Sequence, residues 1–415
     1  MPFLFLLFVV CYLDRINIGF AALTMNKELA ITSQQYGLLS GIFFFGYFLF
    51  EVPSNLLLHK VGARIWFPRI LISWGAVAAL TGFVHTTHQL YLVRFLLGLA
   101  EAGYVPGVYF YVTHWFPKRE RARAIALFNM ASPVASLLGA PVSGLILDHV
   151  HWMGVSSWRW LLVLEALPAI ILGLVIYLVL PSSPREAKFL SPDEKKVIEA
   201  ELGREEEQKL QVREYSVLRA MASPRVWHLI SAYVGITVGG YTLTLWGPQV
   251  VKSFSNMYSN SVVGFLTAIP SLLGLIAMIL VARSSDRMME RRYHVAVCAM
   301  AGATALLLLS AAHSPFYAVA LLSILAMGSY SIFSPFWVIP GEFLTGASAA
   351  AGIALINSVG NLGGFAGPYA IGAIATRTGS LSGGLIVAGA SLFSSAMLVL
   401  LLPKETTRTG KGLIG

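Results

Sequence analysis

The chain has 415 residues, of which 56% are hydrophobic and only 12% are charged, and its mean hydropathy is +0.72. A soluble protein of this length needs roughly a quarter charged residues to cover a water-facing surface. This deficit indicates that much of the outer surface faces lipid. The net charge of +9 does not indicate nucleic-acid binding, because the long apolar runs leave no contiguous basic patch facing water.

Few residues have the spacing of metal ligands or catalytic groups. Cys11 and Cys298 both lie inside apolar runs, so we expect them to be buried, without a disulfide or a metal. Two histidine pairs, 85/88 and 149/151, have no acidic or cysteine ligands beside them. No GxxxxGK[ST] phosphate-binding loop is present. We therefore expect no metal, no cofactor, no ATP-driven step and no enzymatic activity.

Twelve apolar runs are long enough to cross the roughly 30 Å hydrocarbon core of a bilayer as helices. They span residues 3–23, 36–57, 66–83, 90–112, 124–147, 158–180, 226–250, 262–282, 295–312, 316–339, 347–375 and 384–402. The polar stretch between the sixth and seventh runs divides them into two sets of six. We therefore predict an all-α integral membrane protein with a bundle over 1–180, a cytoplasmic linker over 181–225, a bundle over 226–403 and a cytoplasmic tail over 404–415.

Inside the linker, Ser191, Pro192 and Glu194 form a capping-box pattern. It predicts the start of a charged helix that ends near Leu210.

The distribution of the 29 Lys and Arg residues predicts the orientation in the membrane. Most of them fall in 60–69, 118–123, 283–292, the linker and the tail. Positive residues stay on the cytoplasmic side, so both termini are expected there, in a bacterial inner (plasma) membrane.

Of the charged residues that interrupt the apolar runs of the first half, four lie away from the membrane boundaries: Asp14, Arg15, Arg94 and Glu101. Each ionised group costs about 2.5 to 3.5 kcal/mol at the centre of a membrane helix, so it needs a partner or a function. One interpretation is structural, with Asp14 paired to one arginine and Glu101 to the other. The other is functional, because arginine stays charged and binds carboxylates in two-point geometry. Two arginines favour an anionic substrate, and buried carboxylates can be tuned to exchange protons.

Other polar residues at membrane depth are less specific. Glu51 and Glu165 are nearer the membrane boundaries, and we favour structural roles for them. Run 347–375 is rich in glycine and contains Asn357, which can supply an amide donor. In the preceding run Ser334 and Trp337 are three residues apart, so we expect them to share a helix face.

The motifs YLDRINIGFA, EVPSNLLLHKVGAR, RFLLGLAEAGYVPG, THWFPKRERARA, WRWLLVLEALPA and SSDRMMERRYH occur in this order along nearly the whole chain. Together they resemble the major facilitator superfamily. More narrowly they resemble its anion:cation symporter family, which includes bacterial tartrate, phthalate and sugar-acid permeases and is related to sialin and the vesicular glutamate transporters.

The resemblance implies two pseudo-symmetric six-helix bundles around one central site that opens alternately to either side. It implies proton coupling at Asp14 and Glu101 and binding of the substrate carboxylate by Arg15 and Arg94. The further substrate positions that it implies are Tyr12, Tyr47, Trp337 and Asn357, with Ser334 a weaker match. The superfamily's gating loop has His59 at its acidic position in the first copy but keeps Asp286 and Arg287 in the second.

We therefore expect a monomeric secondary transporter that couples uptake of a small organic anion, a carboxylate, to protons by alternating access. One alternative is a uniporter or exchanger of the anion without proton coupling. Another is a membrane sensor, which would need a signalling domain. A channel would need a continuous polar pore, whereas the charges here cluster in one half. The sequence does not name the anion.

Overall fold

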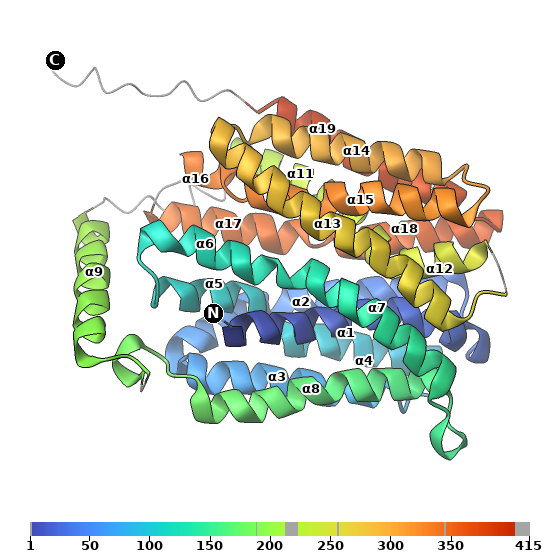
Figure 1. The fold of residues 1–415 in the computed structure, drawn as a ribbon, viewed down its shortest axis with the longest axis horizontal. Helices are drawn as coiled ribbons and strands as arrows, with labels where there is room; N and C mark the ends of the chain where they lie inside the picture. Colours follow the sequence, from blue (N-terminus) through green and yellow to red (C-terminus); the bar gives the residue numbers. More distant parts are fainter. Residues whose placement is uncertain (1, 188, 212–222, 255–256, 344–345, 403–415) are drawn as a thin grey trace.

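The computed structural model describes residues 2–187, 189–211, 223–254, 257–343 and 346–402, with the backbone alone at 118–119, 122, 206–211, 342 and 346–351. All regular elements in these ranges are helices, and most run side by side along one direction (Figure 1). Eleven helical segments, some of which join two or more of the elements named below, are long and apolar enough to cross a membrane in the described part of the chain. The remaining predicted span is formed by two consecutive shorter helices, so the described chain matches the twelve apolar runs.

The first half is built from eight α-helices. They are α1 (Pro2–Glu28), α2 (Ser33–Val61), α3 (Ala63–Thr81), α4 (Thr87–Glu101), α5 (Tyr104–Thr113), α6 (Lys118–Asn129), α7 (Ala131–His149) and α8 (Ser157–Val179), with short 3₁₀ turns at Trp152–Gly154 and Pro184–Glu186.

The second half begins after the linker helix α9 (Pro192–Gln211). Its elements are α11 (Pro224–Tyr241), a π turn η3 (Thr242–Trp246), α12 (Gly247–Ser253), α13 (Asn260–Met288), α14 (Arg292–Leu309), α15 (Pro315–Phe336), α16 (Ile339–Phe343), α17 (Gly346–Gly360), α18 (Gly363–Thr378) and α19 (Ser382–Leu400).

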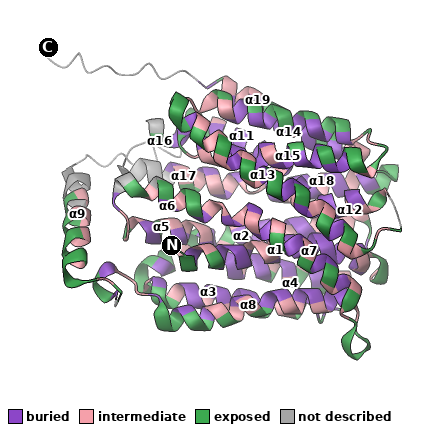
Figure 2. Cartoon of the chain, in the orientation of Figure 1, coloured by how far each residue is buried: buried purple, intermediate pink, exposed green. Residues whose placement is uncertain are grey.

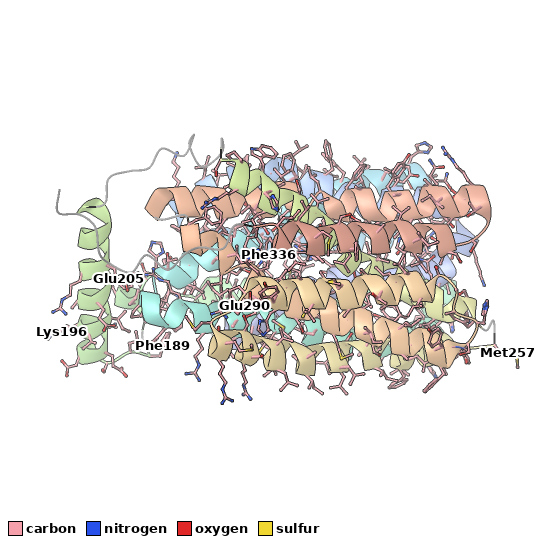
Figure 3. All side chains as sticks on the ribbon, turned by 90° about the horizontal axis from the view of Figure 1, so that it is seen from above. Phe189, Lys196, Glu205, Met257, Glu290 and Phe336 are labelled. Carbon is pink, nitrogen blue, oxygen red and sulfur yellow. The ribbon has the colours of Figure 1, made fainter. Side chains whose placement is uncertain are left out.

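The linker helix α9 stands apart from the bundle at one end of the molecule, which we call the linker end (Figures 1 and 3). The predicted capping box is confirmed, since the Glu194 N–H donates to Ser191 Oγ at 3.2 Å and the Ser191 N–H donates to Glu194 Oε2 at 2.8 Å. This backbone hydrogen bond from Ser191 holds the pKa of the Glu194 carboxyl below its usual value. An ion pair of 2.7 Å between Arg121 and Glu205 ties α9 to the bundle.

Apolar side chains cover the outside of the bundle. Leu56, Leu178 and Val297 are among the large hydrophobic residues that are more than half exposed, and exposed positions follow the outer faces of the helices (Figure 2). A soluble fold would cover these faces with charge, whereas lipid tails solvate them. The outer surface therefore fits a bilayer.

Several predicted runs are interrupted within the membrane. Run 90–112 breaks into α4 and α5 directly after Glu101, where Gly103 takes a left-handed conformation with φ of +84°. A side chain is disfavoured there. Run 347–375 breaks into α17 and α18 at Asn361 and Leu362, and run 226–250 contains the π turn η3. Such interruptions need buried surroundings that satisfy the freed backbone groups.

Hydrogen bonds join the two halves at the far end, opposite the linker. The Tyr36 hydroxyl donates to Leu245 O at 2.8 Å, and the Gln34 N–H donates to Thr376 Oγ1 at 2.8 Å. The Asp148 carboxylate accepts from the backbone N–H groups of Asn260 and Ser261, at 3.1 and 2.6 Å, and so caps the start of α13.

Glycines allow the halves to approach closely at this end. A Cβ placed on Gly372 of α18 would lie 2.1 Å from Ser33 O of α2, and one on Gly264 of α13 would lie 2.4 Å from Ala140 O of α7. These backbone contacts do not tolerate a larger residue. The observed arrangement therefore depends on glycine at both contacts.

We predict that Gly372→Val destabilises this closed far end and lowers the melting temperature by several degrees, because its side chain overlaps the α2 backbone. Accessibility of a cysteine introduced at Gln34 to a membrane-impermeant thiol reagent, together with thermal melting, checks this. Gly203→Ala is the control, since nothing lies within 4 Å of a Cβ there. Equal labelling and melting of wild type and both variants would contradict the prediction.

Candidate functional site

A cavity lies between the two halves, with about 910 Å³ of empty space when its opening to solvent is included. Its lining is aromatic and polar, and Arg15 is the one charged residue among the lining residues in the described part of the chain. The first half contributes Phe8, Tyr12, Arg15, Tyr47, Val105, Tyr109, Asn129 and Ser132. The second half contributes Tyr233, Thr237, Gly240, Tyr241, Leu243, Met278, Ser329, Tyr330, Phe333, Trp337, Asn357 and Asn361. Such a cavity suits a small anion with a polar or aromatic body.

Arg15 in the cavity wall forms an ion pair with Glu101, which lies buried behind that wall. Two nitrogens of Arg15 contact the same oxygen of Glu101, with Nη2 at 2.5 Å and Nε at 2.7 Å. The Glu101 side chain is fully buried, whereas 13% of the Arg15 side chain is exposed. The guanidinium also lies 5.3 Å from the centre of the Tyr47 ring. The Arg15 guanidinium therefore contacts the Glu101 carboxylate on one side and lines the cavity on the other.

Two further contacts complete the surroundings of this pair. Arg15 Nη1 lies 3.5 Å from the Tyr241 hydroxyl of the second half. Cys11, expected to be a buried space-filler, is buried, and its thiol also donates to Glu101 Oε1 at 3.2 Å. Spacing alone could not reveal this contact, because the two residues are 90 positions apart.

Arg94 differs from Arg15 in position. It is 3% exposed and is not among the residues that line the cavity. Its guanidinium lies 5.3 Å from the Phe43 ring, on which Arg15 also packs, at 5.6 Å. Arg94 Nε has no hydrogen-bond partner among the described residues. The structure therefore brings the two arginines to one aromatic ring but exposes only Arg15 to the cavity.

Asp14 lies outside the cavity and makes neutral contacts. The Trp74 indole N–H donates to its Oδ2, and Asn17 Nδ2 donates to its Oδ1 at 3.2 Å. The interpretation that pairs each carboxylate with an arginine thus holds for Glu101 with Arg15. For Asp14, the described residues show no ion pair within 4 Å.

Glu51, for which we favoured a structural role, connects the two halves. Its carboxylate accepts from Asn357 Nδ2 at 2.8 Å and from Ser358 Oγ at 2.5 Å. Asn361 Nδ2 in turn donates to Asn357 Oδ1 at 3.1 Å. Asn357 lines the cavity as expected, but its amide is already engaged on both sides.

Of the other expected substrate positions, Tyr12, Tyr47 and Trp337 line the cavity and Ser334 does not. Ser334, which we expected on the same helix face as Trp337, is therefore absent from the described lining. The pair on that side is Phe333 and Trp337, four residues apart. Ser334 follows Phe333 and is rotated by about 100° from it around the helix.

The second gating motif lies at the linker end of α13. Asp286 forms an ion pair of 2.7 Å with Arg291, a residue that sequence analysis did not select, and not with its neighbour Arg287. In the first copy, the His59 ring lies 5.6 Å from the Phe110 ring. A gating function of Asp286 and Arg287 stays a prediction.

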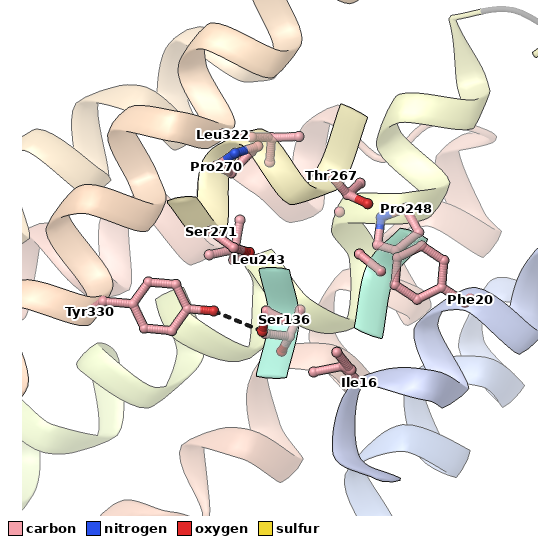
Figure 4. Close-up of a pocket in the computed structure, with 13 residues that line it drawn as sticks. Ile16, Phe20, Ser136, Leu243, Pro248, Thr267, Pro270, Ser271, Leu322 and Tyr330 are labelled. Carbon is pink, nitrogen blue, oxygen red and sulfur yellow. Dashed lines mark hydrogen bonds between the residues drawn. The ribbon is translucent and has the colours of Figure 1, made fainter. Parts of the chain in front are cut away.

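Sequence analysis missed most of the tyrosines of the cavity. Tyr109 donates to Asn129 Oδ1 at 2.9 Å, and Tyr330 donates to Ser136 Oγ at 3.1 Å. Tyr330 and Leu243 also line a neighbouring pocket, whose empty space including its opening to solvent is about 390 Å³ (Figure 4). In a chain with 16 tyrosines, no local pattern distinguishes these from tyrosines that only pack. Among the described residues, no group of three or more His, Cys, Asp or Glu could hold a metal ion.

Comparison with characterised proteins agrees with this architecture. The family model of the Major Facilitator Superfamily matches residues 4–368 and 255–413. A protein of Agrobacterium vitis named "Putative tartrate transporter" is 44% identical over 407 residues, which are 98% of this chain and 90% of that protein. The quinolone resistance transporter of Acinetobacter baumannii is 42% identical, over 92% of this chain and 88% of its own length.

Solved structures show the same fold. The xylose transporter XylE of E. coli, in a partially occluded inward-open conformation, superimposes with a TM-score of 0.75 at 15% identity, covering 97% of this chain and 98% of XylE. A bacterial homologue of the lysosomal transporter Spinster, inward-facing, gives a TM-score of 0.72 at 17% identity, covering 96% of this chain and 94% of its own. The relatives are transporters and not enzymes, and the chain, a multi-pass membrane protein, belongs to the major facilitator superfamily.

Proposed function

We propose that this protein takes up a small organic anion, a carboxylate, together with protons by alternating access of the central cavity. The observation that carries the proposal is Arg15, a permanent cation on the wall of an otherwise uncharged cavity between the two halves. The name of the Agrobacterium relative supports a hydroxylated carboxylate such as tartrate as the first substrate to test.

Competition for Arg15 supplies a coupling mechanism. Both observed contacts of Arg15 with Glu101 use one carboxylate oxygen. A proton on Glu101 would weaken this ion pair and free the guanidinium for the two-point grip of a substrate carboxylate. Loss of that proton would restore the pair and release the substrate. Asp14 is the second candidate proton site.

The closed far end supports the alternating-access part of the proposal. The hydrogen bonds of Tyr36 and Asp148 across the halves would have to break for the cavity to open there. The Glu51 contacts with Asn357 and Ser358 would then serve as the corresponding connection nearer the linker end. We assign the linker end, with both termini, to the cytoplasm, because most Lys and Arg residues lie on that side.

We predict that Arg15→Lys weakens tartrate binding by at least about tenfold. Lysine keeps the positive charge but lacks the planar guanidinium that can bind a carboxylate at two points. Arg94→Lys should change the affinity by less than about twofold and lower the melting temperature instead, since Arg94 is buried behind the wall. Isothermal titration with tartrate and thermal melting of the purified variants check both effects. A larger loss of affinity in Arg94→Lys would contradict the assignment of Arg15 as the main carboxylate contact.

We predict that Glu101→Gln abolishes uphill accumulation of tartrate driven by external acidification, because glutamine cannot take up a proton. Counterflow of tartrate, measured with the same pH inside and outside the vesicles, should continue at a measurable rate. The measurement is labelled tartrate uptake into proteoliposomes. Glu199→Gln is the control, since Glu199 is a carboxylate of α9 in an exposed ion pair.

Full uphill accumulation in Glu101→Gln would refute the proton role of Glu101. Exchange without any response to the pH gradient in the wild type would favour an exchanger or uniporter. Binding of tartrate without uptake or exchange would favour a sensor.

A further inference from the structure

Three asparagines line the central cavity in the described part of the chain: Asn129, Asn357 and Asn361. An amide group carries two N–H donors and one oxygen with two lone pairs, so it can serve either a substrate or the protein itself. The coupling mechanism proposed above uses none of these amides. Asn361 is also not among the positions that the family resemblance implies.

The protein already engages the oxygens of two of these amides. The Tyr109 hydroxyl donates to Asn129 Oδ1 at 2.9 Å, and Asn361 Nδ2 donates to Asn357 Oδ1 at 3.1 Å. Asn361 Oδ1, in contrast, accepts no hydrogen bond from the described residues and is not one of the buried atoms that lack a partner. In the described lining it is therefore the amide oxygen that has no protein donor and is open to a ligand.

Glu51 sets the direction of this chain of hydrogen bonds. An ionised carboxylate can only accept, so Asn357 turns its Nδ2 toward Glu51 Oε1, at 2.8 Å, and its oxygen toward Asn361. Asn361 then turns its nitrogen toward Asn357, which leaves its own oxygen free. A proton on Glu51 Oε2 would not reverse this direction, because the Ser358 hydroxyl, 2.5 Å from that oxygen, can accept as well as donate.

The backbone that carries Asn361 is held in place. Asn361 lies where α17 ends and α18 begins, and this segment packs on α11. The Thr237 hydroxyl of α11 donates to Gly360 O at 2.8 Å. A Cβ placed on Gly363 would lie 2.3 Å from Val234 O. The Asn361 side chain therefore starts from a fixed position, as selective recognition requires.

A hydroxyl group is the substrate group that suits such an amide. Its hydrogen can be donated to the free amide oxygen, and its oxygen can accept from an N–H that stays unused on Asn361 or Asn357. A carbonyl group can only accept, and a methylene group does neither. An acid without the hydroxyl would leave the Asn361 oxygen without a donor when the cavity closes around it, which lowers its affinity.

We propose that Asn361 is a specificity-determining residue that binds a hydroxyl group of the substrate, while Arg15 binds its carboxylate. Glu51 and Asn357 are positioning residues that keep the Asn361 oxygen available. The preferred substrates are then hydroxylated carboxylates, and acids with a carbonyl group or no polar group at that carbon bind less tightly. This inference rests on the proposed function and names the substrate class of the same cavity.

The test uses three dicarboxylates of equal chain length. Malate carries a hydroxyl group, oxaloacetate carries a carbonyl group at the same carbon, and succinate carries neither. Isothermal titration of the purified full-length wild type should show that the better-bound enantiomer of malate binds at least about tenfold more tightly than either analogue. Binding of succinate or oxaloacetate as tight as that of malate would overturn the inference without any variant.

Variants test which residues cause this preference. A shift in the population of the binding-competent conformation scales all three affinities equally, so the ratio of two affinities reports the contact with the substrate. Asn361→Ala should bring the malate-to-succinate ratio to within about twofold of one, because the oxygen that accepts from the hydroxyl is lost. An unchanged ratio in this variant would refute the role of Asn361.

Glu51→Gln tests whether Glu51 sets the direction of the chain. An amide at this position can donate as well as accept, so both orientations of Asn357 become possible. The malate-to-succinate ratio should fall by at least about threefold, and an unchanged ratio would refute the positioning role of Glu51.

Asn55→Ala is the matched control, because Asn55 donates to the backbone oxygen of Glu51 at 2.8 Å and does not line the described cavity. Its ratio should equal that of the wild type, and a loss as large as in Asn361→Ala would overturn the inference. Size-exclusion profiles and melting curves establish that each variant is folded. If the three acids bind the wild type equally, the cavity binds carboxylates as proposed and only the inference about the hydroxyl fails. If none of them binds, the proposed substrate class fails, and with it this inference.

Discussion

A charge inside a membrane must be compensated by the protein itself, and the buried pair of Arg15 and Glu101 is where this constraint is strongest. Both contacts join the guanidinium to one carboxylate oxygen, at 2.5 and 2.7 Å. Removing one partner leaves an uncompensated buried charge, which typically costs about 3 to 5 kcal/mol. In the proposed mechanism, a substrate carboxylate takes Arg15 only when Glu101 is neutralised at the same time, which would link binding of the anion to binding of a proton.

The need to compensate buried charges also explains why the other polar groups of the first half lie at different distances from the cavity. Arg15 reaches the cavity, Arg94 stays behind its wall, and Asp14 is satisfied by the Trp74 and Asn17 side chains instead of a cation. The substrate would thus meet one charged group, and the groups that could exchange protons lie one layer deeper. This separation lets protonation change the site without placing carboxylates in contact with the anion.

The second half contributes few charges and supplies most of the neutral lining. Tyr233, Tyr241 and Trp337 present rings and polar tips that can adapt to the body of different acids. Asn357 is held by Glu51 across the halves, so its amide senses the relative position of the two bundles. The helix interruption at Asn361 and Leu362 lies four residues after Asn357, and Asn361 also lines the cavity. Under the proposed alternating access, this interruption would lie in the part of the molecule that changes during transport.

Sequence by itself determined the number of spans, the division into two halves and the linker helix with its cap, because these depend on local hydropathy and capping patterns. It also selected the four intramembrane charges, since each is rare and costly in an apolar run. Tertiary structure decided which of them pair and which face the cavity. Cys11 and Glu101 are 90 positions apart, and Glu51 and Asn357 are 306 positions apart. Contacts between distant helices depend on packing and rotation that no local pattern encodes. For that reason the sequence could name Glu165 but could not show that the Ser143 hydroxyl of α7 donates to it.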